Sequence, residues 1–222
     1  MKKLFAALIL GALAAAAGLY AASADGRFPP LNDGDLIFQT STSNQSAAIL
    51  LATADPFSHM GIIKHINGDI VVVEASDHVK ETPLRVWVNR GLFKRVAIYR
   101  DTQLTQEQIG KILASAKTMY GKPYDIFFSF NNDAIYCSEL PYLAFKAAGV
   151  SIGKIQKLSE LHFDNALVRH LIKRRWQRDP ECTSKGYDFE QCYQHLLDQD
   201  LITPASIARD CQFKRIYSNY PL

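Results

Sequence analysis

The sequence lacks several patterns that would assign it to common functional classes. It has no Cys-x-x-Cys pair, no His-Glu-x-x-His motif and no cysteine and histidine spacing of the zinc-finger type. Those patterns indicate redox-active or metal-dependent proteins. Internal repeats and low-complexity linkers are also absent. We therefore expect neither a metal nor another cofactor, and one α+β domain with a mixed C-terminal extension.

A strong excess of charge of one sign is absent too. The 222 residues carry a formal net charge of +3, and removing residues 1–24, which hold two lysines and no acid, leaves +1. Near-neutral charge gives no reason to expect nucleic acid as a partner. The basic run from Lys173 to Arg178 is predicted to be the solvated end of a helix. Hydrophobic residues make up 48% of the chain, which is enough to bury a sizeable core.

The first 24 residues have the pattern of a secretory leader. Lys2 and Lys3 precede an Ala-rich apolar run, and Ala22-Ser23-Ala24 fits the small-x-small rule of signal peptidase. We predict cleavage after Ala24 and a mature protein that is periplasmic or secreted. The alternative is a retained membrane anchor, because the apolar run is just long enough to span a bilayer. Envelope association therefore stays open, and the sequence does not predict the oligomeric state.

The four cysteines fall into two groups. Cys137 is far in sequence from Cys182, Cys192 and Cys211. Thiols tend to pair in an oxidising compartment, and a disulfide between Cys182 and Cys192 would close a short loop around Gly186. Cys211 in place of either partner also fits the pattern, because disulfide connectivity cannot be read from spacing.

Apolar periodicity and turn residues predict the elements of secondary structure. Strands are expected at 35–39, 59–66, 70–75 and 96–100. Helices are expected at 43–54, 105–119, 138–148 and 165–176, with short helices beginning at Pro83 and at Thr203-Pro204. Asn67-Gly68 predicts a tight hairpin between the second and third strands. Thr105 and Gln108 form a capping box, and Thr82 is expected to cap the helix that begins at Pro83.

Cys137 occupies a position that favours a reactive thiol. It follows a polar loop and stands where a helix is predicted to begin. Unpaired N–H groups and the positive end of the helix dipole lower the pKa of a cysteine there. The same N–H groups can stabilise an oxyanion. The alternative is a small buried hydrophobe or one half of a disulfide.

The predicted hairpin brings a histidine and a glutamate together. With Asn67-Gly68 as a two-residue turn, Glu74 faces Gly61, and His59 lies two residues from Gly61 on the same face of the strand. A glutamate in an apolar strand is costly unless it is paired. An imidazole N–H would satisfy it and leave the other ring nitrogen basic. Nucleophile, base and orienting group are the parts of a thiol hydrolase.

A set of short motifs between Gly34 and Tyr142 has a specific order and spacing. The residues are Gly34-Asp-Leu-Ile-Phe-Gln39, Gln45-Ser46 with Ala48-Ile49, Ala52-Thr53, Ser58-His59 with Gly61, Glu74-Ala75, Val79 with Thr82-Pro-Leu and Trp87, Gly121-Lys-Pro-Tyr-Asp125, and Tyr136-Cys-Ser-Glu139. This set resembles the YaeF/YiiX group of circularly permuted papain-like amidases, part of the NlpC-type cysteine hydrolase superfamily. The resemblance is weak in the tail, where the three further cysteines are not part of the family pattern.

The resemblance implies a permuted papain-like core in which a small antiparallel sheet packs against the cysteine-bearing helix. Carried over by position, Cys137 is the nucleophile, His59 the base and Glu74 the orienting residue. Tyr124, Tyr136 and Ser138 would contact the substrate. The alternative for Tyr124 is that it is only a half-buried tyrosine of the loop. The implied layout is a signal peptide at 1–24, a hydrolase core at 25–160 and an extension packed on that core at 161–222.

The resulting hypothesis is an exported hydrolase that cleaves a peptide or cell-envelope amide through an acyl-thioester on Cys137. A lipid or thioester acyl hydrolase or acyltransferase is the second hypothesis, and a long apolar groove beside Cys137 would favour it. A third is a non-catalytic envelope binding module that kept the fold. The substrate class rests on the family resemblance alone.

Overall fold

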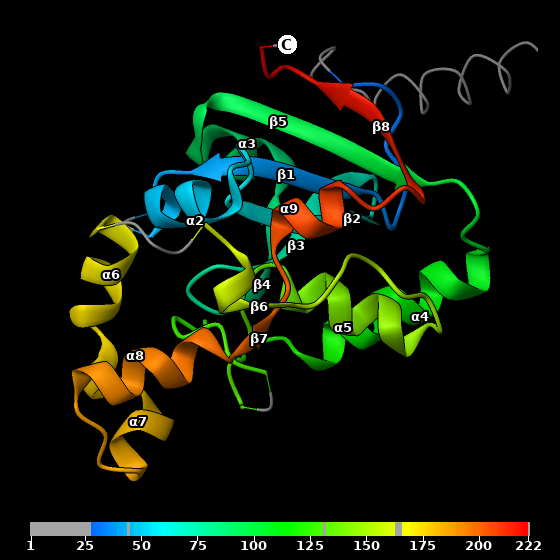
Figure 1. Ribbon diagram of the computed structural model, residues 1–222. Coiled ribbons are helices and arrows are strands. Elements are labelled where there is room, and N and C mark those ends of the chain that lie inside the picture. The colour runs from blue at the N-terminus through cyan, green and yellow to red at the C-terminus, as the bar shows by residue number, and fades with distance from the viewer. Residues whose placement is uncertain (1–27, 44, 131, 163–165, 222) are drawn as a thin grey trace, which may run out of the picture.

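A computed structural model describes residues 28–43, 45–130, 132–162 and 166–221 of the chain. The predicted leader and its cleavage site lie outside these residues. The main sheet is antiparallel and six-stranded, in the order β4-β3-β2-β1-β5-β8 (Figure 1). Its strands are β1 (Leu36–Ser41), β2 (His59–Ile66), β3 (Asp69–Ala75), β4 (Val79–Pro83), β5 (Gly91–Asp101) and β8 (Phe213–Ser218). A second, two-stranded sheet pairs β6 (Gln156–Lys157) with β7 (Asp200–Leu201).

Helices cover both faces of the main sheet. The α-helices are α2 (Ser46–Thr53), α3 (Leu84–Arg90), α4 (Gln106–Thr118), α5 (Glu139–Ala147), α6 (Ala166–Lys173), α7 (Pro180–Ser184), α8 (Phe189–Leu197) and α9 (Pro204–Ala208). Two short 3-10 helices span Leu158–Glu160 and Trp176–Arg178. Along the described residues, no helix is long and apolar enough to cross a membrane. The α+β class predicted from the sequence is confirmed.

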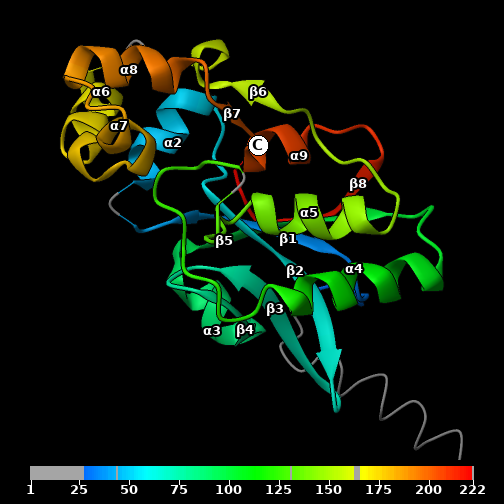
Figure 2. The same cartoon turned by 90° about the horizontal axis from the view of Figure 1, so that it is seen from below.

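Strand alternation divides the core into two clusters. Leu36 and Phe38 point to one face of the sheet, where they pack with residues of α4, α5 and α9, and Ile37 points to the other face. That second face is covered by α3, whose Trp87 is fully buried. Figure 2 shows α4 and α5 side by side along the sheet. The sheet therefore packs against the cysteine-bearing helix on one face only.

The predicted hairpin between β2 and β3 is confirmed. Asn67 and Gly68 both have positive φ, and Ile66 pairs with Asp69 across the turn. Ile62 pairs with Val73 further along, which is the predicted register. The prediction that Thr82 caps the next helix is wrong. That helix has no side-chain cap, and the Thr82 hydroxyl binds the Glu74 carboxylate instead.

Residues after 160 contribute to the main core as well as to an outer layer. Strand β8, which the sequence did not predict, pairs with β5, and Phe213, Ile202 and Ile207 belong to the core cluster around α5. Helices α6, α7 and α8 form the outer layer, where the predicted disulfide joins Cys182 to Cys192. The boundary at residue 160 stays a prediction, but the structured tail is part of the folding unit.

Candidate active site

Cys137 lies two residues before the start of α5, next to the N-cap residue Ser138, and is almost fully buried. Its side chain is a free thiol, whereas the other free cysteine, Cys211, is exposed. The thiol lies 3.9 Å from the carbonyl oxygen of Ser58, the residue that precedes β2. The segment before the helix and the start of the strand therefore meet at this point.

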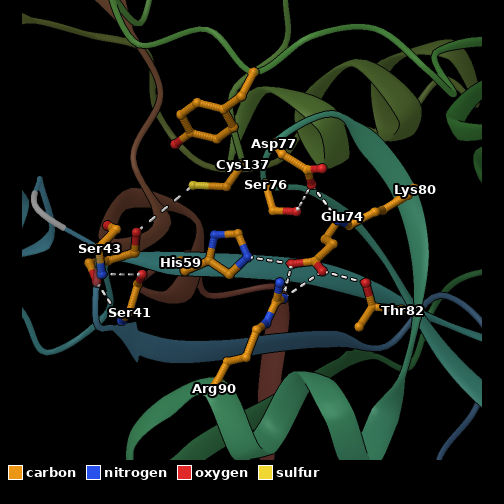
Figure 3. Close-up of polar contacts among 12 residues, drawn as sticks. Ser41, Ser43, His59, Glu74, Ser76, Asp77, Lys80, Thr82, Arg90 and Cys137 are labelled. Carbon is orange, nitrogen blue, oxygen red and sulfur yellow. Dashed lines mark hydrogen bonds and ion pairs between the residues drawn. The ribbon is translucent and has the colours of Figure 1, made fainter.

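His59 is placed between the thiol and a buried carboxylate. Its Nε2 atom lies 2.7 Å from Oε2 of Glu74, a distance typical of a charge-assisted hydrogen bond. Figure 3 shows the imidazole ring between Glu74 and Cys137, with its other nitrogen on the side of the thiol. Since Nε2 is engaged by the carboxylate, Nδ1 is the ring nitrogen that remains on the side of Cys137.

Glu74 has two further partners that the sequence analysis did not identify. The Thr82 hydroxyl donates to its Oε1 at 2.5 Å, and Nη2 of Arg90 donates to Oε1 at 2.5 Å and to Oε2 at 2.6 Å. Glu74 itself is completely buried, while the Arg90 side chain is 40% exposed. Thr82 faces Val72 in the β3–β4 ladder, which positions it next to Glu74. Arg90 is the last residue of α3, and no local pattern predicts that it turns back to the sheet.

Trp87 shields the histidine–glutamate pair from water. Its ring stacks on the His59 ring with centroids 5.8 Å apart and an interplanar angle of 25°. Nε1 of Trp87 has no hydrogen-bond partner among the described residues, and the same holds for Oε1 of the buried Gln39. The aromatic ring over His59 lowers the local dielectric, which strengthens the electrostatic coupling between His59 and Glu74.

The electrostatics of the pair favour a thiolate and an imidazolium. Burial alone would lower the pKa of His59, but hydrogen bonds and charge from Cys137 and Glu74 outweigh it and raise that pKa to about 9. Burial alone would raise the pKa of the Cys137 thiol, but the hydrogen bond and charge of His59 outweigh it and lower that pKa below its ordinary value. Each group thus stabilises the charged form of the other.

The buried carboxylate remains ionised for the same reason. Burial raises the pKa of Glu74, whereas the contacts with His59, Thr82 and Arg90 lower it more, to about 2.

Glu139, in the first turn of α5, behaves in the opposite way. Burial dominates there and raises its pKa to about 8, so this side chain is neutral at neutral pH and adds no negative charge beside the thiolate.

Tyr124 lies at the thiol, on the loop that precedes Cys137. Burial, together with the nearby negative charge of Cys137, raises the pKa of its hydroxyl well above its ordinary value. The hydroxyl lies close to the Cys137 thiol and accepts a hydrogen bond from Gln45 Nε2 at 3.1 Å. It is thus placed to donate to a negatively charged oxygen formed beside Cys137.

A residue of the tail supports this tyrosine indirectly. Nη1 of Arg175 donates to Oε1 of Gln45 at 3.0 Å and to the carbonyl oxygen of Ile126 at 3.3 Å. The prediction that the basic run is a solvated helix end is therefore wrong for Arg175, which is half-buried. A chain of contacts leads from Arg175 through Gln45 to Tyr124, and sequence spacing carries no signal for it.

Tyr136 and Ser138, the neighbours of Cys137, are buried and tied to the tail. The Tyr136 hydroxyl accepts a hydrogen bond from the backbone N–H of Ile202 at 3.0 Å, and the Ser138 hydroxyl donates to the carbonyl oxygen of Ile202 at 2.8 Å. Their polar atoms are therefore engaged by the protein. Their predicted contact with a substrate stays a prediction, and it would involve their carbon atoms.

A cavity of about 120 Å³ opens beside Cys137, between the core and the outer helices. Most of the side chains that line it are apolar. They are Ala48, Ile49, Ala52, Ile126, Phe127, Phe128, Leu158, Leu161, Val168, Leu171, Ile172, Trp176, Leu196, Leu201, Ile202 and Pro204. Thr53, Tyr136, Cys137, Ser138, Arg175, Asp179 and Thr203 complete the lining. The tail thus supplies much of the wall of a cavity that Cys137 also lines.

Comparison with known proteins places this arrangement in a family. The model of the family described as permuted papain-like amidase enzyme, YaeF/YiiX, C92 family matches residues 30–217. The chain is 38% identical over 191 residues to the uncharacterized protein YiiX of Escherichia coli (strain K12), covering 85% of this chain and 87% of that protein. It is also similar to a crystal structure of YiiX from Escherichia coli O157:H7, with a TM-score of 0.75 and 33% identity over 86% of this chain and 98% of that chain.

The crystal structure of that relative is described as one of a metalloprotein. In residues 28–43, 45–130, 132–162 and 166–221 of this chain, no group of three or more His, Cys, Asp or Glu side chains is arranged to hold a metal ion. Three other histidines there each contact one carboxylate, His65 with Asp33, His78 with Asp77 and His195 with Glu181. These residues do not fit a metal centre, and we derive no step through one.

Proposed function

The chain belongs to the YaeF/YiiX family of permuted papain-like amidases, and from this premise we propose that it hydrolyses amides through an acyl-thioester on Cys137. The family makes it an enzyme of the cysteine hydrolase kind. The observation that carries the proposed roles is the position of the His59 ring, between a buried carboxylate and a buried thiol. The substrate we propose is a peptide or an amide of the cell envelope.

The geometry supports a two-step reaction. The Cys137 thiolate attacks the carbonyl carbon, a C–S bond forms, and the backbone N–H of Cys137 with the Tyr124 hydroxyl stabilises the oxyanion. The His59 imidazolium then protonates the leaving nitrogen and the C–N bond breaks. In the second step His59 takes a proton from water, the hydroxide attacks the thioester, and the C–S bond breaks to release the acid. Glu74 holds the ring in the required orientation throughout.

Alkylation of the folded protein tests the assigned nucleophile. We expect iodoacetamide at about pH 6 to modify Cys137 faster than an unperturbed thiol, because the His59 imidazolium lowers the pKa of the thiol. His59→Ala should slow this reaction at least tenfold. His65→Ala, which removes a histidine paired with Asp33, is the matched control and should leave the rate unchanged.

Two results would reject the proposed roles. If Cys137 is alkylated no faster than the exposed Cys211, the thiol is not activated. If His59→Ala and His65→Ala have equal effects, His59 does not act on the thiol. A mass-spectrometric search for an acyl adduct after incubation with envelope extracts identifies the nucleophile independently, because the adduct must disappear in Cys137→Ala.

Export is part of the proposal and is tested separately. The leader pattern of residues 1–24 supports a mature chain that begins at Asp25. Intact-mass measurement of the protein expressed in a bacterial host should give the mass of residues 25–222 in the periplasmic fraction. A full-length mass in the membrane fraction would support the retained anchor instead.

A further inference from the structure

We infer that the cavity beside Cys137 binds an aliphatic acyl chain, so that the substrate class is an N-acyl amide with a long apolar acyl group. This inference rests on the proposed function, because it assigns the acyl half of the same amide. It starts from the lining of the cavity, which is formed by α2, by the loop before Cys137 and by the tail. The chain released by hydrolysis would be a fatty acid.

The polar side chains of the lining are hydrogen-bonded to other parts of the protein. Thr53 donates to the carbonyl oxygen of Ile49, Asp179 accepts from the N–H of Cys182, and Thr203 accepts from the N–H of Ser206. Arg175 and Ser138 are held in the same way by contacts already described. A charged or polar side chain that entered this mainly apolar cavity would lose much of its hydration, which is costly.

The size of the cavity suits an apolar chain. Apolar protein cavities of about 150 Å³ stay dry and hold guests such as benzene, and this one has about 120 Å³. It therefore holds a stretch of hydrocarbon more readily than ordered water. An aliphatic chain also gains from burial of each methylene group, whereas an acetyl group would leave the cavity empty.

The position of the cavity relative to His59 decides which half of the substrate enters it. Its lining includes Cys137 but neither His59 nor Glu74, although both are described. His59 must face the leaving nitrogen in order to protonate it. The amine therefore leaves on the histidine side, and the acyl group that stays bound to Sγ extends into the cavity.

Alkyl chloromethyl ketones test this assignment without knowledge of the natural amine. The Cys137 thiolate forms an S–CH₂ bond and chloride leaves, while the alkyl group of the ketone takes the place of the acyl chain. We expect the second-order rate constant of Cys137 modification to increase from methyl to hexyl to decyl. The gain should approach about fourfold for each methylene that enters the cavity. Intact-mass spectrometry against Cys137→Ala measures the modification at each chain length.

A pair of variants on one helix locates the effect. Ile49 lines the cavity from α2, whereas Leu51 on the same helix is 50% exposed and does not. Ile49→Trp fills part of the cavity, so the ratio of the decyl to the methyl rate constant should fall at least tenfold. Leu51→Trp adds the same ring to the surface and should leave that ratio unchanged.

The outcomes separate this inference from the proposed function. If Cys137 reacts with all three ketones at equal rates, or if the two variants behave alike, the acyl-chain inference is overturned and the proposed function stands. If none of the ketones modifies Cys137 faster than it modifies Cys211, the proposed function itself fails. Should Ile49→Trp not fold, the chain-length series on the unaltered protein still decides the matter.

Discussion

Polar contacts of the site converge on one residue, Glu74. Its side chain is inaccessible to solvent and accepts hydrogen bonds from His59, Thr82 and Arg90. A buried carboxylate with three donors is stabilised as an anion, and its charge in turn stabilises the imidazolium. We therefore expect the reactivity of Cys137 to depend on Glu74, although Glu74 does not contact the thiol.

Replacing this carboxylate tests its effect on the thiol. In Glu74→Gln the negative charge beside His59 is lost, so the pKa of His59 falls and the thiolate of Cys137 loses stabilisation. We expect the midpoint pH of Cys137 alkylation to rise. The rate of alkylation at pH 6 should fall by about tenfold. Glu81→Gln removes a carboxylate that binds Lys64 and Tyr120 and should leave the profile unchanged. Identical profiles for both variants would contradict the role given to Glu74.

The same residue predicts how stability depends on pH. The pKa of Glu74 is lowered from 4.5 to about 2 in the folded protein, so its stabilising contribution is fully present above pH 4.5 and is lost as the pH falls toward 2. A shift of this size corresponds to about 3 kcal/mol. Urea unfolding between pH 6 and pH 3 should show a steeper loss in the unaltered protein than in Glu74→Gln. Parallel losses would mean that other carboxyl groups dominate acid unfolding.

At the scale of elements, the β2–β3 hairpin depends on close approach at one glycine. A Cβ atom at Gly61 would lie 2.4 Å from Cγ1 of Val72 and 2.7 Å from the carbonyl oxygen of Val73. Because that oxygen belongs to the backbone of the neighbouring strand, the strands would have to separate. The His59–Glu74 contact spans the same two strands and would lengthen with them.

Two alanine substitutions test this requirement. We expect Gly61→Ala to destabilise the fold by about 1–3 kcal/mol, as overpacking does, and to slow Cys137 alkylation. Gly110→Ala in α4 is the control, because a Cβ there meets nothing within 4 Å and alanine favours a helix by about 1 kcal/mol over glycine. Thermal unfolding compares the two variants. An unaltered melting temperature in Gly61→Ala would show that the strands tolerate the added methyl group.

At the scale of the whole molecule, the end of the chain completes the sheet. β8 pairs with β5 along Ala97–Asp101, and Phe213 is buried in the main core against Phe145. The tail also provides Ile202, whose backbone binds both neighbours of Cys137. The structured part of the tail therefore contributes to the sheet, to the core and to the walls of the site.

Truncation tests this dependence. A chain that ends at Gln212 would expose the edge of β5 and remove Phe213 from the core, so we expect a loss of cooperative thermal unfolding and aggregation in size-exclusion chromatography. Lys214→Ala, which alters only an exposed side chain of β8, should remain monodisperse with the native transition. A truncated protein that still unfolds cooperatively would show that residues 213–222 are not needed for the folding unit.

Local features of this chain followed from the sequence because they depend on neighbours within a few residues. Asn67-Gly68 sets the register that joins His59 to Glu74, and the Thr105–Gln108 capping box begins α4 as predicted. The family motifs were likewise short segments with a defined order, and the family comparison confirms the class of enzyme.

Tertiary structure alone decided the contacts between segments that are distant in sequence. Arg90 reaches Glu74 from the end of a helix, Arg175 reaches Gln45 across 130 positions, and β8 joins β5 at the edge of the sheet. The apolar cavity beside Cys137 also exists only where α2, the loop before the cysteine and the tail come together. Such contacts depend on how packed layers are oriented, and neither periodicity nor spacing along the chain encodes that orientation.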